Sequence, residues 1–183
     1  VASCSAKDWP LLEEISKAGL PTIISTGGLS LNDIDNIVSF FDHKGVDFAL
    51  MHCISIYPTP SDEMQLGFLK TLKDRYPKVE IGWSTHEHPN DYDVIKIAYS
   101  IGAKIFERHV GLSNEKISLN KYSSTPRQIE EWIQSFFKTK SIIGSENKIV
   151  SDNEIKSLSN LKRGIYFKND LKKNQVIKEN DIF

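Results

Sequence analysis

The sequence predicts an α/β protein with a parallel sheet, equivalent to about half of a TIM (β/α)8 barrel followed by the start of a small β unit. Short apolar runs rich in β-branched residues alternate with segments of helical period. Four complete strand and helix units follow a leading strand stub and helix. Ionisable residues stand directly after several strands, where parallel barrels carry their active sites. A doubly wound open sheet is the structural alternative, because periodicity alone does not exclude it.

The hydrophobic pattern predicts each element in chain order. The run 21–28 is apolar and ends in two glycines, as a buried parallel strand does. Ser30 is a candidate N-cap for the helix that follows. The expected elements are a strand stub at 1–2, a helix at 5–17, strands at 21–28, 47–53, 80–84 and 103–109, and helices from 30, from 61, at 92–101 and from 125.

The last part of the chain has a different composition. We assign residues 1–142 to the partial barrel and 143–160 to a linker, because Lys, Ser, Asn and Glu replace the apolar period there. Residues 161–183 form a third segment, with strand-like runs at 165–167 and 176–177. This segment is too short for a core of its own, so it is expected to be the truncated start of a small β domain.

Composition narrows the classes of function. The 23 basic and 24 acidic residues are scattered along the chain, which does not favour a nucleic-acid partner. Cys4 and Cys53 form no C-x-x-C pair, which argues against a disulfide framework or a zinc site and fits a reducing cytoplasm. No run approaches the roughly 18 apolar residues of a membrane helix. The chain begins at Val1 rather than Met, and we expect it to be part of a longer protein.

Two histidines at neighbouring strand ends are the strongest candidates for chemistry. Ser84 and His86 share one face of their strand, and Glu107 and His109 share one face of the next. Neutral imidazole is the commonest metal ligand, and a carboxylate such as Glu107 could orient one of the rings. For a single histidine the ordinary alternative, a satisfied or solvated polar residue, would be favoured; the pair at consecutive strand ends favours a divalent-metal site.

The other histidines are not selected. His43 precedes a glycine at a helix end, His88 lies in a loop, and His52 is expected to face the helix layer. Ser55 and Tyr57 share one side of a strand end, where their hydroxyls could bind substrate oxygens. A proline-rich turn that packs the tyrosine ring explains the same residues equally well. The glycines that end the 21–28 strand are better explained by a tight turn than by a phosphate site.

The motifs around these residues resemble a known family. The segments 24–27, 52–60, 82–86 and 106–109 are similar, in order and spacing, to the later barrel strands of the sialic acid synthases. That family includes synthases of N-acetylneuraminic, legionaminic and pseudaminic acids and spore-coat polysaccharide synthases. The resemblance covers roughly residues 1–132, and the tail from 163 to 182 resembles the start of the antifreeze-like, or SAF, domain that follows the barrel.

The resemblance implies a reaction and roles for several residues. Phosphoenolpyruvate would add through its C3 to the aldehyde of an N-acylated amino sugar, and attack of water at C2 would release phosphate. His86 and His109 match the two ligands of a divalent metal, Mn²⁺ first and Mg²⁺ or Co²⁺ as alternatives. Ser84, Ser55 and Ser3 match positions near phosphoenolpyruvate, and Tyr57 matches a tyrosine that contacts the sugar.

Several departures from the family pattern concern the rest of the site. Residues 117–124 replace a Gly-Pro-Asp loop, and Ser5 stands where some members have a sugar-binding Glu, so the acceptor sugar is not identified. The phosphate-binding lysine of the family would precede Val1, and an arginine that reaches a partner subunit would follow Phe183. No catalytic residue is therefore assigned within this chain.

The leading hypothesis is a cytoplasmic, metal-dependent nonulosonic acid synthase that forms a homodimer in its full-length form. One alternative is another metal-dependent barrel lyase or hydrolase, which an Asp or Glu metal ligand would favour. The other is a noncatalytic relative or fragment that serves as a binding module.

Overall fold

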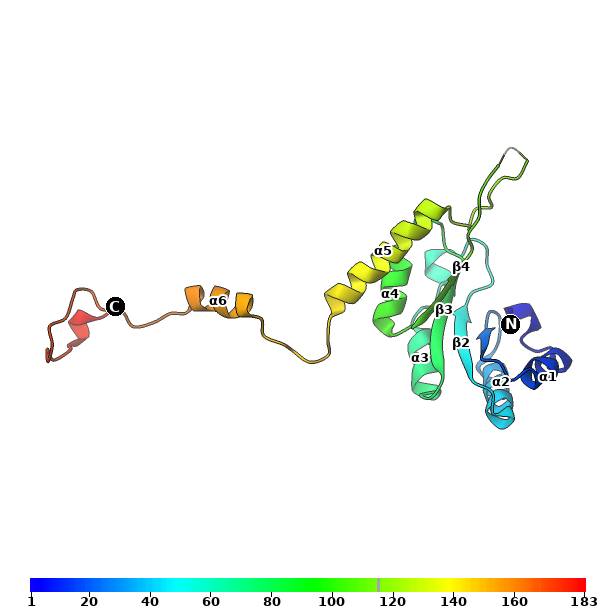
Figure 1. Ribbon diagram of the computed structural model, residues 1–183, viewed down its shortest axis with the longest axis horizontal. Coiled ribbons are helices and arrows are strands. Elements are labelled where there is room, and N and C mark those ends of the chain that lie inside the picture. The colour runs from blue at the N-terminus through cyan, green and yellow to red at the C-terminus, as the bar shows by residue number, and fades with distance from the viewer. Residues whose placement is uncertain (115) are drawn as a thin grey trace. The chain divides into compact units, whose positions relative to one another are not determined.

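The computed structural model describes residues 1–114 and 116–183 and divides into two compact units, Val1–Gly144 and Ser145–Phe183. The first unit contains a sheet and most of the helices (Figure 1). Its strands are β1 (Thr22–Ser25), β2 (Phe48–Cys53), β3 (Glu80–Thr85) and β4 (Ile105–Arg108). Its helices are α1 (Trp9–Lys17), α2 (Leu31–Lys44), α3 (Phe68–Arg75), α4 (Asp93–Ile101) and α5 (Pro126–Ile143), with short 3₁₀ turns at η1 (Ser3–Ser5) and η2 (Ser61–Glu63).

The four strands are all parallel and follow one another in the sheet in the order β1-β2-β3-β4. Each strand therefore pairs with the next strand in the sequence. A doubly wound sheet would reverse its strand order at a switch point, whereas a barrel adds each strand beside the last. The predicted fold class, half of a (β/α)8 barrel, is confirmed, and the doubly wound alternative is wrong.

The core lies between the sheet and the helices that follow the strands. Ile24, Leu50 and Trp83 point from β1, β2 and β3 toward the helices and are fully buried. They pack in one cluster with apolar residues of α1 to α4, among them Leu12, Ile34, Phe41, Leu69 and Val94. The alternate residues of each strand point to the other face of the sheet, where no layer of helices in the described part of the chain covers them.

The helices begin at residues that suit an N-terminus. Ser30 caps α2 in a capping box with Asp33, as predicted from the sequence. Thr125 caps α5 in a second capping box with Gln128, and Pro126 follows at the first helical position. These caps set where the chain turns from each strand-end loop into a helix.

Two expected elements differ in the structure. The helix expected from Ser61 is a 3₁₀ turn at Ser61–Glu63, and the α-helix starts only at Phe68. Gln65 has a positive φ of 47°, which interrupts the helical backbone between the two. The strand stub at residues 1–2 is present only as two hydrogen bonds beside β1, in which the Val1 amino group donates to the Ile23 carbonyl and the Val1 carbonyl accepts from the Ser25 amide.

The second unit contains a helix that the sequence did not predict. The segment read as a linker, 143–160, contains most of α6 (Asp152–Leu161), which Ser151 caps. The tail has no strand at 176–177; instead, Phe167 forms an antiparallel bridge with Ile182, and Tyr166 exchanges backbone hydrogen bonds with Phe183. The assignment of 161–183 to an SAF-type domain stays a prediction.

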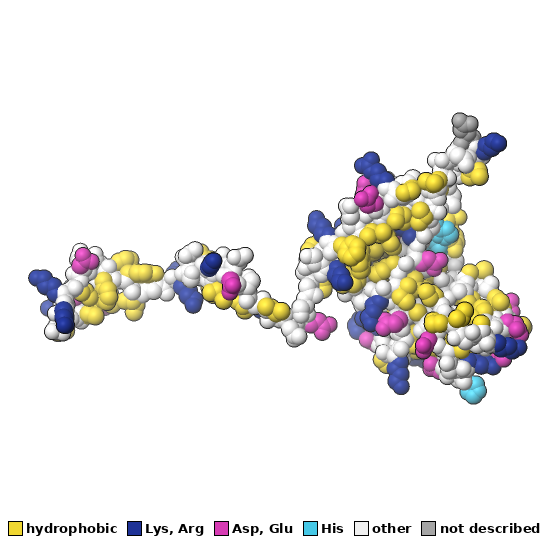
Figure 2. Space-filling view, viewed as in Figure 1, with side chains coloured by type: hydrophobic (Ala, Val, Ile, Leu, Met, Phe, Trp, Pro, Cys, Tyr) yellow, Lys and Arg dark blue, Asp and Glu magenta, His cyan; other side chains and the backbone are white. Residues whose placement is uncertain are grey.

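Apolar side chains are exposed along α5. Figure 2 shows them gathered over this helix, where Ile133, Phe137 and Ile143 are exposed. None of the helices in the described part of the chain has the length and apolar content needed to cross a membrane.

Candidate functional site

The carboxyl ends of β2, β3 and β4 bring the predicted residues together. The strand register places Cys53, Ser84 and Glu107 in one row on the face away from the helices. Side chains alternate along a strand, so His86 and His109, two positions further on, continue the same face. Their ring centroids lie 5.3 Å apart. The structure therefore brings the predicted pair together.

One ring nitrogen of His86 is held by a hydrogen bond, and the other is left without a proton. Its Nδ1 lies 2.9 Å from the carbonyl oxygen of Ile54, which can only accept, so Nδ1 carries the proton and Nε2 is left with a lone pair. Burial lowers the pKa of His86, against the opposing effect of the Ile54 hydrogen bond, and so favours the neutral form that can ligate. His109 is exposed beside it.

The carbonyl of Ile54, rather than Glu107, orients His86. In the described residues Glu107 makes no hydrogen bond to either histidine, although its charge lies close enough to raise the pKa of His86 slightly against burial. No group of three His, Cys, Asp or Glu side chains in 1–114 and 116–183 has the geometry of a metal site. The donor set thus fits an open site with two imidazole ligands, in which water or substrate oxygens would complete the coordination of an ion such as Mn²⁺.

Two tyrosines enclose the histidine pair. The ring of Tyr57 lies 4.1 Å from His86, and the ring of Tyr122 lies 5.1 Å from both Tyr57 and His109, between centroids. The side chain of Asn120 accepts hydrogen bonds from the backbone amides of Tyr122 and Ser123 and so shapes this loop. Sequence reasoning identified Tyr57 but missed Tyr122. An aromatic residue in the loop after the His109 strand was the available signal.

The predicted hydroxyls surround a glycine at the end of β1. Ser3 Oγ accepts a hydrogen bond of 2.8 Å from the Gly27 amide. A Cβ on Gly27 would overlap the hydroxyls of Ser3 and Ser55 and approach Cys53 Sγ to 3.2 Å. Burial raises the pKa of the Cys53 thiol, while hydrogen bonds with Ser3, Ser84 and Ser55 act against it. Ser3, Ser55 and Ser84 therefore converge in one polar cluster around Gly27 and Cys53, which the sequence had not shown.

A buried ion pair lies behind the histidines. The side chains of Glu87 and Arg108 are 0% and 2% exposed and bind each other through Arg108 Nη1. Burial raises the pKa of Glu87, and the charge of Arg108 opposes that shift. The sequence did not predict this pair, because a single Glu or Arg is most often expected to be exposed to solvent.

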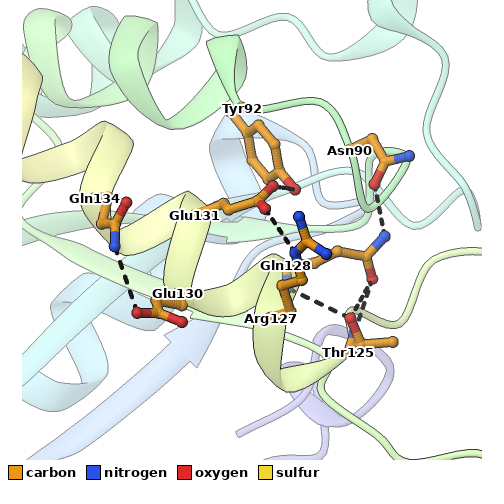
Figure 3. Close-up of polar contacts among 8 residues, drawn as sticks. All are labelled: Asn90, Tyr92, Thr125, Arg127, Gln128, Glu130, Glu131 and Gln134. Carbon is orange, nitrogen blue, oxygen red and sulfur yellow. Dashed lines mark hydrogen bonds and ion pairs between the residues drawn. The ribbon is translucent and has the colours of Figure 1, made fainter.

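The loop that carries His86 is also tied to the start of α5. Figure 3 shows the Asn90 side chain accepting a hydrogen bond of 2.6 Å from Gln128 Nε2, and the Tyr92 hydroxyl donating to Glu131 over 2.7 Å. Arg127 pairs with the same glutamate along the helix. These contacts are more exposed than the Glu87–Arg108 pair, and they fasten the loop after β3 to α5, whereas that pair joins the loop to the end of β4.

The remaining histidines lie where the sequence predicted. His52 packs in the helix layer against Phe68 and Trp83, and its Nε2 lies 3.1 Å from the carbonyl of Met64. His43 is in the last turn of α2, and His88 is exposed in the loop after β3.

Comparison with known proteins decides the family. The sequence profile of the NeuB family matches residues 1–148 of this chain. The chain belongs to the NeuB family. NeuB-family relatives include sialic acid synthases and synthases of related nonulosonic acids, so the resemblance that the motifs indicated is confirmed.

Individual relatives show how far the similarity extends. The N-acetylneuraminate-9-phosphate synthase of Drosophila melanogaster is 35% identical over 132 residues, which cover 71% of this chain and 35% of the synthase. The N,N'-diacetyllegionaminic acid synthase of Campylobacter jejuni is 26% identical over 186 residues, with 100% of this chain and 55% of the synthase covered. Among solved structures, the spore coat polysaccharide biosynthesis protein E of Chromobacterium violaceum is 38% identical, with a TM-score of 0.84, over 100% of this chain and 55% of that chain. The NeuB-family chain described here thus spans about half the length of these relatives, or less.

Proposed function

We propose that this chain supplies the metal-binding side, and part of the phosphoenolpyruvate-binding side, of a nonulosonic acid synthase. The single observation that carries the proposal is the His86–His109 pair, 5.3 Å apart between ring centroids, with a cluster of serine hydroxyls at the ends of the same sheet's strands. The family match supports an enzyme that makes a sialic-acid-like product. The names of the relatives state nonulosonic acid products, and we propose an amino-sugar acceptor and phosphoenolpyruvate as substrates on the resemblance of the motifs.

The reaction joins two substrates at the strand ends. C3 of phosphoenolpyruvate forms a bond to the aldehyde carbon of an N-acylated amino sugar, whose carbonyl electrons pass to its oxygen. Water then adds to C2, and phosphate leaves. A divalent ion bound by His86 and His109, with Mn²⁺ best suited, would act as a Lewis acid on the aldehyde oxygen.

The other residues of the site bind and orient the substrates. Ser3, Ser55 and Ser84 would donate hydrogen bonds to the carboxylate or phosphate of phosphoenolpyruvate, since their hydroxyls converge at Gly27 and Cys53. Tyr57 and Tyr122 would contact the acceptor sugar, because their rings border the histidine pair on its open side.

The alternatives receive less support. A metal-dependent hydrolase would be favoured by a carboxylate ligand, and no three-member ligand group of this kind occurs in the described part of the chain. A noncatalytic module is not favoured by the family match over residues 1–148. We propose a cytoplasmic location, which the free thiols of Cys4 and Cys53 support, and a homodimer of the full-length protein, which light scattering after size-exclusion chromatography tests.

The test is a phosphate-release assay on the intact protein that contains this chain. Phosphoenolpyruvate, Mn²⁺ and a panel of N-acyl hexosamines and their 6-phosphates are supplied, and the product is identified by its mass. We expect release of phosphate with at least one sugar and loss of that release on addition of EDTA. Absence of phosphate release with every sugar in the panel would count heavily against the proposal.

A further inference from the structure

The buried pair Glu87–Arg108 occupies an unusual place in the site. Glu87 directly follows His86, and Arg108 directly precedes His109. Because successive side chains point to opposite faces of a strand, the two histidines face the open side of the sheet while Glu87 and Arg108 face the helix layer behind it. The ion pair therefore joins, from behind, the same two backbone segments that carry the histidines in front.

Arg108 binds more than its glutamate. Its Nε donates to Ser124 Oγ over 2.6 Å, its Nη2 donates to the carbonyl of His88 over 3.2 Å, and its guanidinium lies 5.6 Å from the ring centre of Trp132 in α5. One side chain thus connects the loop after β3, the end of β4 and the start of α5. The planar, fork-like guanidinium suits this role because its donors have fixed directions.

Stability alone does not explain why both charges are buried here. Two charges lose their hydration on burial, and a packed apolar pair of similar volume is often at least as stable. Glu87 Oε2 also has no hydrogen-bond partner among the described residues, so the pair is not fully satisfied. What an ion pair provides that an apolar pair does not is a fixed separation and orientation of the two segments.

We propose that Glu87 and Arg108 are positioning residues that hold His86 and His109 at the separation at which both bind one divalent metal ion. The proposal rests on the metal site of the proposed function. It assigns no contact between Glu87 or Arg108 and the metal, which lies on the opposite face of the strands. Groups that orient metal ligands typically change metal affinity by about 10-fold to 100-fold when they are removed.

The test is Mn²⁺ binding to the folded protein, measured by calorimetry and by the electron paramagnetic resonance signal of free Mn²⁺. In the double variant Glu87→Gln with Arg108→Met, both charges are removed, so that no unpaired charge stays buried. We expect its Kd for Mn²⁺ to rise by roughly 10-fold to 100-fold at a temperature well below its unfolding midpoint. The single variant Arg108→Lys keeps a cation opposite Glu87 but loses the fixed donor directions of the guanidinium, and we expect its Kd to rise by an intermediate factor of roughly threefold to tenfold.

The matched control removes an exposed ion pair from the other end of the same two strands. Lys104 and Glu80 lie 2.9 Å apart at the starts of β4 and β3, with 65% and 55% of their side chains exposed. We expect Glu80→Gln with Lys104→Met to leave Kd for Mn²⁺ unchanged.

The outcomes separate this inference from the proposed function. If the unmodified protein binds no Mn²⁺, the metal site itself is wrong, and the positioning role fails with it. If the unmodified protein binds Mn²⁺ and the double variant is less stable but binds with the same Kd, Glu87 and Arg108 are only structural and the inference is overturned. Should the double variant not fold, Arg108→Lys decides: an unchanged Kd in that variant overturns the inference, because the fixed donor directions of Arg108 would then not matter for metal binding.

Discussion

The imidazole of His86 lies 5.3 Å from that of His109, between ring centroids, at the ends of two adjacent parallel strands. The first ring is buried and is oriented by the Ile54 carbonyl, and the second is exposed. This arrangement leaves a nitrogen of His86 available on the open side of the sheet, next to the position of His109.

Replacing either histidine should abolish Mn²⁺ binding. We expect His86→Ala and His109→Ala each to raise Kd by more than about 100-fold, because loss of a ligand exceeds the effect of losing a group that merely orients one. His43→Ala, at the end of α2, is the matched control and should leave Kd unchanged. Calorimetric titration with Mn²⁺ measures all three, and full binding by both site variants would refute the ligand assignment.

Adding a methyl group at Gly27 should displace the serine hydroxyls that cluster around it. A Cβ there overlaps the hydroxyls of Ser3 and Ser55, so Gly27→Ala should lower the free energy of unfolding by about 1–3 kcal/mol and weaken phosphoenolpyruvate binding. In contrast, a Cβ at Gly67 meets nothing within 4 Å, and its φ of −54° suits alanine. Gly67→Ala should therefore stabilise the protein by up to about 1 kcal/mol. Urea unfolding and phosphoenolpyruvate titration distinguish the two variants. If both variants had the same stability and the same affinity for phosphoenolpyruvate, the role assigned to the serine hydroxyls around Gly27 would be wrong.

Tyr122 should affect the acceptor sugar rather than phosphoenolpyruvate. Its ring lies 5.1 Å from His109 between centroids, on the side assigned to the sugar. In the intact synthase, Tyr122→Ala should raise KM for the acceptor about tenfold or more, consistent with the loss of an aromatic contact worth roughly 1.5 kcal/mol, and leave KM for phosphoenolpyruvate unchanged. Leu112→Ala, in the same loop with 74% of the residue exposed, is the control and should change neither constant. A rise in KM for phosphoenolpyruvate, with KM for the sugar unchanged, would show that Tyr122 borders the phosphoenolpyruvate side of the site instead.

Stability should fall in mild acid partly because of His52. Burial lowers the pKa of His52 below its ordinary value of 6.5, although its hydrogen bonds with Met64 and Gln65 oppose this. Below pH 6.5 the imidazole of His52 therefore binds a proton more readily in the unfolded chain than in the folded chain. The free energy of unfolding keeps its full value above pH 6.5 and falls as the pH drops from there toward the lowered pKa. Urea unfolding between pH 8 and 5 should show this decline in stability, and the decline should be smaller in His52→Gln. His86, whose pKa burial also lowers, contributes in the same direction. An unchanged slope in the variant would contradict the role of His52.

The parts of the site that the sequence predicted are those that depend on local geometry. His86 with Ser84, and His109 with Glu107, share a face because strand side chains alternate, and His52 faces the helices for the same reason. Capping residues such as Ser30 and Thr125 likewise act within one turn of their own helices. These interactions extend over a few residues, so a single sequence shows them.

Other features are decided only when distant segments pack. Tyr122 reaches the histidines because its loop folds back over the strand ends, and Glu87 meets Arg108 because the loop after β3 and the end of β4 are pressed against α5. In the tail, Phe167 pairs with Ile182, and the short strand expected at 176–177 does not form. The sequence by itself determined the strand and helix order and the face on which each histidine lies, since both follow from local period. The tertiary structure decided which loops, charged side chains and aromatic rings surround those histidines. These contacts join segments that are far apart in the sequence, and no local pattern of residues predicts them.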